Sequence, residues 1–446
     1  MNDDTIAAVS TPPGRGGVGI IRISGPAAPA IAAGLFGELP RANRAVLRTF
    51  RDAGGRMIDQ GLALYFPAPA SFTGEDVLEL HGHGSPVVLD MLLLRVFKLG
   101  ARPARPGEFS ERAFLNDKLD LAQAEAIADL IDSGTRQAAR AALRSLEGEF
   151  SQAIDALVAA LTELRVHVEA AIDFPDEEVD FLSDGAIGEQ LAGLTDTLAG
   201  IEAGATQGRL LRDGITSVIA GRPNAGKSSL LNRLAQADVA IVTPEPGTTR
   251  DVLQSTIQLD GLPLTIVDTA GLRPGGGAIE REGMRRARAR LDTADVVLLV
   301  VDDEVGYGAD DAAIIDALPA ELPVCRIYNK IDLSGRTAGR CDEAEHRCVA
   351  LSAETGEGLD ELIGLIKAIV GYQGGGDNFM ARRRHLDALA RAGEHLSTAR
   401  RHYDDRSGEL IAEELRLAQQ ALGEITGTVT SEDLLAQIFS SFCIGK

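Results

Sequence analysis

The stretch Gly221-Arg-Pro-Asn-Ala-Gly-Lys-Ser228 decides the fold of this chain, because it fits the phosphate-loop pattern G-x-x-x-x-G-K-[ST]. Residues 215–220 are apolar and β-branched, which predicts a buried strand, and residues 229–234 predict a helix. Glycines in such a strand-to-helix turn let backbone N–H groups surround phosphate oxygens. We expect Lys227 to reach the β- and γ-phosphates and Ser228 to ligate Mg²⁺. A glycine-rich turn that matches by chance is the alternative, and the motif alone leaves the base open.

Two later motifs offer further groups to the metal and the γ-phosphate. Thr249, in Gly247-Thr-Thr-Arg-Asp251, has a hydroxyl that could complete the Mg²⁺ shell. Asp268-Thr-Ala-Gly271 follows the apolar segment 264–267, so its carboxylate would meet the Mg²⁺ shell and its glycine N–H the γ-phosphate.

Two more motifs, each at the end of an apolar segment, predict the base. The carboxylate of Asp332, in Asn329-Lys-Ile-Asp332, can accept from both guanine N1–H and the 2-amino group. Adenine offers neither donor, so ATP would leave this carboxylate unpaired at a cost on the order of 1–3 kcal/mol. Ser352-Ala353 can close over guanine O6. Five motifs in order indicate a guanine-nucleotide domain that resembles the translation-factor-related class of small GTPases.

The expected nucleotide-binding residues belong to these motifs and to the segment between the first two. They are Asn224, Ala225, Gly226, Lys227, Ser228, Ser229, Thr243, Thr248, Thr249, Asp268, Thr269, Ala270, Gly271, Asn329, Lys330, Asp332, Ser352 and Ala353. One departure is Leu272, which stands where signalling GTPases carry the glutamine that orients the attacking water. Hydrolysis therefore needs another way to hold water and to offset charge.

Composition limits the remaining possibilities. A net charge of −22 over 446 residues argues against a broad basic surface that grips nucleic acid alone. None of the four cysteines forms a C-x-x-C pair, and Cys341, His346 and Cys348 are disfavoured as a zinc site. Sparse thiols, the lack of a signal-peptide pattern and the lack of an apolar run of about 20 residues predict a cytoplasmic protein without a membrane span.

The pattern of residues changes several times along the chain. Residues 1–118 predict an α/β domain, with strands near 18–23, 62–66 and 77–80 and a helix over 86–99. Helical periodicity then occupies 119–212 and returns over 373–446, on either side of the nucleotide domain at 213–372. The prediction is one discontinuous helical domain that carries an inserted Ras-like P-loop domain with a mostly parallel sheet.

Several polar or terminal features allow more than one interpretation. His81 and His83 have no companion ligand that the sequence identifies, which disfavours a metal site, and the charge of Glu79 within an apolar strand points to solvent or binds a donor. The acidic stretch 174–180 predicts a solvated loop, with metal binding a minor alternative. At the end of the chain, the apolar segment 434–439 should dock and hold Cys443 in a defined place, against the alternative of a frayed terminus.

The chain as a whole resembles the MnmE (TrmE) family of tRNA-modification GTPases. The resemblance covers the full length, and the terminal motif and the domain order make it specific. It is carried by Thr11-Pro-Pro-Gly-Arg-Gly-Gly-Val-Gly19, Phe72-Thr-Gly-Glu-Asp76, Pro106-Gly-Glu-Phe-Ser-Glu-Arg112, Asn116-Asp-Lys-Leu-Asp120, the inserted nucleotide domain and the terminal Cys443-Ile-Gly-Lys446.

The resemblance implies an N-terminal domain that binds tetrahydrofolate and dimerises. It implies a donor such as 5-formyl-tetrahydrofolate, with Arg22, Glu79, Lys118 and Lys446 at the family's binding positions. It also implies an FAD- and NADH-using partner, MnmG (GidA), in a heterotetramer that reaches tRNA mainly through the complex. Together they would add carboxymethylaminomethyl or aminomethyl to C5 of wobble uridine U34 in certain tRNAs.

The resemblance also implies a substitute for the missing glutamine. A K⁺ ion would stand in place of an arginine finger, with Asn224, Thr243, Glu245 and Thr248 at its positions, and Glu280 would orient the water. The glycine-rich segment 273–278 leaves the resting position of Glu280 open. The expected catalytic residues are therefore Glu280, Lys227 and Cys443, and the chemical role of Cys443 is left open.

Two other functions were weighed against a K⁺-stimulated GTPase in tRNA modification. An Era- or Der-like ribosome-assembly GTPase would need a basic RNA-binding module, which the acidic balance and helical flanks do not offer. A nucleotide-locked scaffold would need a damaged phosphate loop, whereas this loop is intact.

Overall fold

The computed structural model of the chain describes residues 4–173, 185–237, 254–268, 294–343, 346–374 and 378–445. The chain falls into two compact units, which are described separately. The first combines residues 1–128, 145–194 and 391–446, and the second combines 129–144 and 195–390. Among the described helices, none is both long enough and apolar enough to span a membrane.

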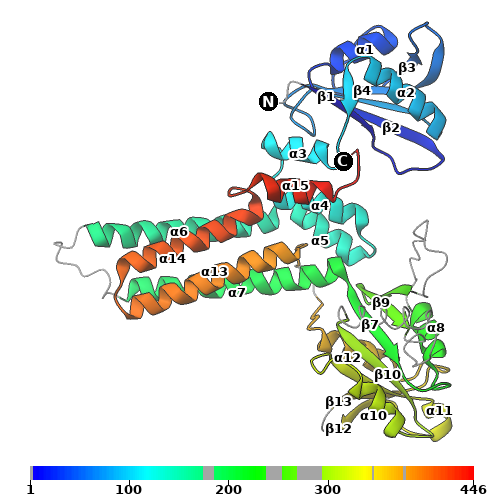
Figure 1. Ribbon diagram of the computed structural model, residues 1–446, viewed down its shortest axis with the longest axis vertical. Helices are drawn as coiled ribbons and strands as arrows, with labels where there is room; N and C mark the ends of the chain where they lie inside the picture. The colour runs from blue at the N-terminus through cyan, green and yellow to red at the C-terminus, as the bar shows by residue number, and fades with distance from the viewer. Residues whose placement is uncertain are drawn as a thin grey trace. The chain divides into compact units, whose positions relative to one another are not determined.

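The first unit begins with a six-stranded sheet of order β3-β4-β5-β2-β1-β6 (Figure 1). Neighbours pair antiparallel except β1 and β6, which are parallel. Two helices, α1 (Ala28–Phe36) and α2 (Pro86–Lys98), share an apolar core with the sheet. The strands are β1 (Thr5–Val9), β2 (Gly16–Ser24), β3 (Val46–Arg51), β4 (Met57–Phe66), β5 (Val77–Gly84) and β6 (Ala101–Pro103).

Alternation along β2 and β5 gives this sheet two unlike faces. Ile21, Ile23, Leu78 and Leu80 are buried in the core with the helices. The intervening residues, which include Arg22 and its cross-strand partner Glu79, therefore face the other side. This polar face is where the folate site is expected.

Long helices form the rest of the first unit. α6 (Glu149–Asp173) and α14 (Gly408–Thr426) lie side by side (Figure 1). Their inward residues, such as Leu161 and Leu415, are fully buried. The shorter helices α3 (Glu108–Leu115) and α15 (Glu432–Ser440) also belong to this unit. Residues in both units are contributed by α4 (Leu121–Asp132), α7 (Ala186–Asp213) and α13 (Arg383–Asp404).

The second unit is built on a seven-stranded sheet of order β12-β13-β11-β10-β7-β9-β8. Its five central strands are parallel, and the edge strands β8 and β12 pair antiparallel with their neighbours. The strands are β7 (Ile215–Ala220), β8 (Gln254–Leu259), β9 (Leu262–Asp268), β10 (Val296–Asp302), β11 (Val324–Asn329), β12 (Gly339–Glu343) and β13 (His346–Leu351).

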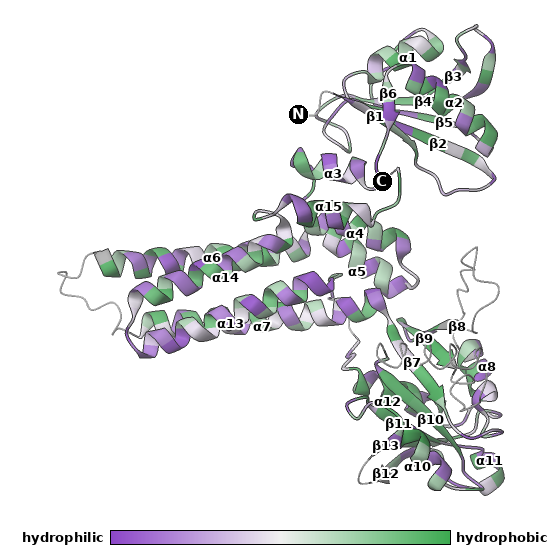
Figure 2. Ribbon diagram, viewed as in Figure 1, coloured by the Kyte–Doolittle hydropathy of each residue, from purple (hydrophilic) through white to green (hydrophobic). Residues whose placement is uncertain are grey.

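Burial explains the apolar runs in the sequence of this sheet. Residues 296–301 of β10 are all inaccessible to solvent, as expected for a central parallel strand covered on both faces. Figure 2 shows this sheet as the most continuously hydrophobic part of the second unit. The helices of the unit are α5 (Arg136–Leu146), α8 (Lys227–Ala237), α10 (Ala309–Asp316), α11 (Ile331–Ser334) and α12 (Leu359–Ile369). The predicted class, an α/β domain, a helical part and a P-loop fold with a mostly parallel sheet, is confirmed.

Candidate functional site

Three of the five expected nucleotide-binding motifs lie within the described residues, and they meet at one edge of the seven-stranded sheet. The phosphate loop follows β7, Asn329 ends β11, and Ser352 follows β13. Because these strands are parallel, their carboxyl ends lie along one edge, where open α/β sheets bind their ligands.

Two glycines of the phosphate loop leave room for a neighbouring atom that a Cβ would displace. Gly221 has φ +135°, and a Cβ there would lie 2.2 Å from the carbonyl oxygen of Val300. Gly226 has φ +96°, and a Cβ there would lie 2.1 Å from Nδ2 of Asn329. Asn224, at φ 61°, also adopts the left-handed conformation, which asparagine tolerates better than most residues.

Lys227 begins helix α8 and folds back over the loop. Its Nζ donates to the carbonyl oxygens of Gly221 and Arg222, each at 2.8 Å. These are weaker partners for an ammonium group than phosphate oxygens, so a bound nucleotide would replace them. Ser228 and Ser229 follow on the first turn of α8 and are exposed.

A buried ion pair behind the loop was not predicted. Arg222 contacts Asp311 at 2.7 Å, and Asp311 is completely buried. The same guanidinium donates to the carbonyl oxygen of Gly306 at 2.5 Å. Arg222 occupies an unspecified position of the motif, and its partner lies 89 residues away, so no spacing rule identifies the pair.

Asn329 joins the phosphate loop to the expected base site. It is 2% exposed, and its Nδ2 donates to the carbonyl oxygen of Ala225 at 2.9 Å. Its Oδ1 accepts from the backbone N–H of Ala353 at 2.9 Å. One side chain thereby fixes the distance between the phosphate loop and the segment after β13.

The carboxylate of Asp332 is held by the serine that follows β13. Ser352 Oγ donates to Asp332 Oδ1 at 2.5 Å and itself accepts from the N–H of Thr355 at 3.1 Å. Lys330 forms an ion pair with Asp302 at 2.6 Å. The structure therefore brings Asp332 and Ser352 together, as a shared base site requires.

Part of the expected site lies outside the described residues. Asp268 is described as the last residue of β9, without its side chain. Outside lie Thr243, Glu245, Thr248, Thr249, Thr269, Ala270, Gly271, Leu272, Glu280, Lys446 and the acidic stretch 174–180.

On the polar face of the first sheet, Glu79 binds two donors, which settles the alternatives for this charge. Arg22 Nε donates to Glu79 Oε1 at 2.9 Å, and His81 Nε2 lies 3.1 Å from Glu79 Oε2. The Arg22 guanidinium lies 5.2 Å from the ring centre of Phe72 and 5.8 Å from that of Phe109.

The expectation that the two histidines lack companions was wrong. Glu79 contacts His81, and Asp59 of the neighbouring strand β4 contacts His83 Nδ1 at 2.7 Å. The sequence could not identify Asp59, because strand pairing brings it close. Within the described residues, however, no group of three or more potential metal ligands is found.

Lys118 belongs to the same unit but not to the Arg22–Glu79 pair. Its Nζ donates to the carbonyl oxygen of Pro69 at 3.0 Å, and it lines a pocket of about 450 Å³. The loop of residues 69–76 contacts both groups, since Phe72 of this loop lies over Arg22. Arg22 and Glu79 thus meet directly, and Lys118 reaches the loop that adjoins them.

The C-terminal segment docks, as its apolar residues predict. Ile438, Phe439 and Phe442 are buried against α4. Beyond them, the N–H of Gly107 donates to the carbonyl oxygen of Cys443 at 3.3 Å, and the Cys443 thiol stays exposed. The backbone around Cys443 is therefore held in place.

Comparison with known proteins gives matches along the whole chain. The family models described as "GTP-binding protein TrmE N-terminus" and "MnmE helical domain" match residues 5–118 and 121–443. The tRNA modification GTPase MnmE of Alkalilimnicola ehrlichii is 59% identical over 447 residues and 100% of both chains. The protein of that name from Methylococcus capsulatus is 59% identical over 444 residues and 99% of both.

Matches to solved structures are partial. Aquifex aeolicus Era bound to GDP.AlF4- is 26% identical, covers 41% of this chain and 66% of that chain, and has a TM-score of 0.27. The G domain of the T. maritima FeoB iron transporter is 25% identical, covers 36% and 99%, and has a TM-score of 0.26.

Proposed function

This chain belongs to the MnmE family of tRNA modification GTPases, and on that premise we propose a division of work among its sites. The chain is a GTP hydrolase that acts in tRNA modification. The proposal adds that hydrolysis is stimulated by K⁺ and that the one-carbon unit comes from tetrahydrofolate. With an MnmG-like flavoprotein, the chain then adds carboxymethylaminomethyl or aminomethyl to C5 of wobble uridine U34. An Era- or Der-like role in ribosome assembly is the less favoured alternative, because the relatives that match the full chain are tRNA modification GTPases.

The two hydrogen bonds of the Asn329 side chain are the observation that supports GTP as the substrate most directly. It ties the phosphate loop at Ala225 to the segment at Ala353, next to the Asp332–Ser352 pair. Phosphates on the loop and guanine on Asp332 would then be held at a fixed separation. Lys227 would exchange its two carbonyl partners for phosphate oxygens.

The residues at the phosphate end suit two metal ions. Ser228, on the first turn of α8, and Thr249 would hold Mg²⁺, which would supply positive charge against the phosphates. Asn224, exposed in the loop, would hold K⁺ together with Thr243, Glu245 and Thr248, and this cation would offset charge on the transferred phosphoryl group. Glu280 would orient the attacking water.

The polar face of the first sheet suits a folate. Glu79 presents a carboxylate, and a pterin ring carries N–H donors that such a group recognises. Arg22 uses Nε for Glu79, so the two Nη groups could meet a carboxylate of the ligand. Lys118 and Lys446 would complete the site, with Cys443 nearby in a role left open.

The remaining parts of the proposal concern assembly. A net charge of −22 favours tRNA binding through a partner more than through this chain alone. The N-terminal domain would form the homodimer, and the dimer would join the MnmG-like protein in a heterotetramer. The family relationship supports a cytoplasmic location for this work.

The test of K⁺ stimulation is GTP hydrolysis in KCl and in NaCl at equal ionic strength. We expect hydrolysis to be faster in KCl by about tenfold or more, because Na⁺ is too small for the same set of oxygens. Asn224→Gly should abolish the difference, since glycine adopts φ 61° without strain and lacks the amide oxygen. GTP binding should persist, because Lys227 and the loop amides remain.

The outcomes separate K⁺ binding from a merely structural role of Asn224. Asparagine is common at left-handed positions, so it could serve only the loop conformation. Equal rates in both salts for the unmodified protein would exclude K⁺ stimulation. Glu280→Ala should differ from Asn224→Gly, because K⁺ should still bind at Asn224 while hydrolysis stops in both salts.

A further inference from the structure

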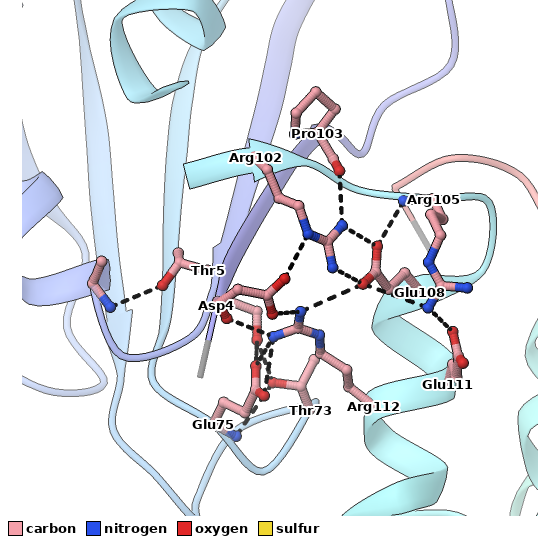
Figure 3. A network of polar contacts seen from close by, with 12 residues as sticks. Asp4, Thr5, Thr73, Glu75, Arg102, Pro103, Arg105, Glu108, Glu111 and Arg112 are labelled. Atoms are coloured by element: carbon pink, nitrogen blue, oxygen red, sulfur yellow. Dashed lines mark hydrogen bonds and ion pairs between the residues drawn. The ribbon is translucent and has the colours of Figure 1, made fainter. Parts of the chain in front are cut away.

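Two motifs that the proposed sites leave without a role meet in one network of charges, centred on the buried side chains of Arg112 and Glu108 (Figure 3). They are Phe72-Thr-Gly-Glu-Asp76, in the loop before β5, and Pro106-Gly-Glu-Phe-Ser-Glu-Arg112, at the start of α3. Arg112 is 2% exposed, and its Nη1 donates to both carboxylate oxygens of Glu75, at 3.1 and 3.0 Å. Its Nη2 donates to Asp4 Oδ1 at 2.7 Å.

A second cluster of charges fixes the N-terminal end of α3, the helix that carries Arg112. Arg102 donates to both oxygens of Glu108, at 2.9 and 2.5 Å, and to Asp4 Oδ2 at 2.6 Å. The N–H of Arg105 donates to Glu108 Oε2 at 2.7 Å. The carboxylates of Asp4 and Glu108 thus hold two guanidinium groups, Arg102 and Arg112, in one arrangement.

Glu75 connects Arg112 to the loop of residues 69–76 and to strand β2. Ser24 Oγ donates to Glu75 Oε2 at 2.7 Å and lies 2.7 Å from Thr73 Oγ1. The carbonyl oxygen of Thr73 accepts from Asn116 Nδ2 at 2.7 Å. Thr73 is fully buried, so the backbone next to Phe72 is held from both sides.

Phe72 is the residue of this loop that lies against Arg22, in the expected folate site. Its ring lies over the guanidinium of Arg22, which donates to Glu79. A displaced loop would remove the ring and free Arg22 to turn away from Glu79. The network is therefore linked to the orientation of Arg22 through a short chain of contacts, from Arg112 to Glu75, Thr73 and Phe72.

We propose that Glu75 and Arg112 are positioning residues for folate binding, which act by holding Phe72 against Arg22. This inference rests on the proposed function, in which Arg22 and Glu79 bind the folate. Burial of an ion pair carries a desolvation cost that a well-packed apolar pair would avoid, so stability alone is a weak reason for such a network. Fixing one conformation of the loop is the advantage that the contacts offer.

The test measures binding of 5-formyl-tetrahydrofolate to the full-length chain by calorimetry. We expect Glu75→Gln, which keeps the shape but removes the charge, to weaken binding by about tenfold, and Phe72→Leu to weaken it similarly. In the double variant the two losses should not multiply, because both changes remove the same contact between Phe72 and Arg22. Glu75→Asp should bind folate more tightly than Glu75→Gln in the same assay, because aspartate keeps the negative charge that Arg112 contacts.

Glu111→Gln is the matched control. Glu111 belongs to the same network through Arg105, at 2.9 Å, but its recorded partner is not in the loop of residues 69–76. This variant should bind folate like the unmodified protein. All variants should hydrolyse GTP at the unmodified rate, and thermal unfolding should confirm that each is folded.

The outcomes distinguish this inference from the function on which it rests. If the unmodified chain binds folate and Glu79→Ala does not, then unchanged binding in Glu75→Gln overturns the positioning role alone. Losses that multiply in the double variant, or an equal loss in Glu111→Gln, overturn it as well. If the unmodified chain does not bind folate, that result contradicts both the proposed folate site and the positioning role.

Discussion

At the scale of single residues, the proposed guanine site would depend on one carboxylate, that of Asp332, and on the Ser352 hydroxyl that holds it. Ser352 Oγ donates to Asp332 Oδ1 at 2.5 Å, which leaves Asp332 Oδ2 as an acceptor for the base. Guanine N1–H and its 2-amino group are the donors that such an acceptor would select. Because ATP offers neither, discrimination needs no further residue.

We therefore expect Asp332→Asn to exchange the specificity of the site. The amide can donate to the 2-oxo group of xanthine, and it no longer accepts two hydrogen bonds from guanine. GTP affinity should fall by about tenfold or more, while xanthosine triphosphate becomes a substrate. Competition binding with both nucleotides measures the exchange, and unchanged GTP affinity would remove Asp332 from the site.

Residue identities in this site were predictable wherever a motif sets their spacing. Lys227, Asn329 and Asp332 follow from strand ends and from the chemistry of phosphate and guanine. The pair Arg222–Asp311 was not predictable, because its members lie 89 residues apart and nothing local marks either one. Tertiary ion pairs of this kind are set by packing, on which sequence periodicity carries no information.

At the scale of elements, β6 and α3 are joined by the buried charges around Glu108. Burial alone would raise the pKa of Glu108, but the hydrogen bonds from Arg102 and from the Arg105 N–H outweigh it and lower that pKa below its usual value. Burial also acts on Asp4, where contacts with Arg102 and Arg112 again give a lowered pKa. The folded chain thus stabilises the charged form of both carboxylates relative to the protonated form.

The lowered pKa values predict acid sensitivity of the first unit. A group with a depressed folded pKa contributes stability above its unfolded pKa, and this contribution is lost as the pH falls through the folded pKa. The usual pKa values are 3.8 for Asp4 and 4.5 for Glu108, so the loss should begin near pH 4.5 and continue below. Calorimetric unfolding from pH 7 downward measures it.

Glu108→Gln tests the origin of this sensitivity. At pH 7 the variant should lose about 1–3 kcal/mol, because Arg102 and Arg112 lose a charged acceptor. Its stability should also depend less on pH below 4.5 than that of the unmodified chain. An identical slope in both proteins would assign the acid sensitivity to other carboxylates.

Elements were predictable where burial imposes a period on the sequence. The apolar residues of α6 and α14 recur every three or four positions, and their faces are buried as expected. The edge strand β12 was not predicted, because Gly339-Arg-Cys-Asp-Glu343 has no apolar alternation. Its place in the sheet comes from pairing with β13, which a local pattern cannot reveal.

At the scale of the whole molecule, the nucleotide domain is continuous with the long helix before it. α7 ends at Asp213, and β7 begins at Ile215 and leads into the phosphate loop. Gly214 connects them at φ +69°, where a Cβ would lie 2.9 Å from the carbonyl oxygen of Pro263. Along the chain, the single strand β7 therefore separates the phosphate loop from α7, a helix of 28 residues.

The order of domains along the chain was predictable from composition and motifs, and its boundaries remain a proposal. Helical periodicity on both sides of the nucleotide motifs indicates an insertion. The two compact units divide the chain differently, since α7 and α13 contribute residues to both. Long helices shared between units leave no break in composition that would mark such a division.

The most direct test of the central claim is mass analysis of the wobble uridine in tRNA from cells that lack this chain. The account predicts that U34 of the substrate tRNAs loses the carboxymethylaminomethyl or aminomethyl group and that the unmodified gene restores it. Glu79→Ala should fail to restore it although the variant still hydrolyses GTP, because only the folate site is damaged. Normal modification of U34 in cells without the chain would contradict the account.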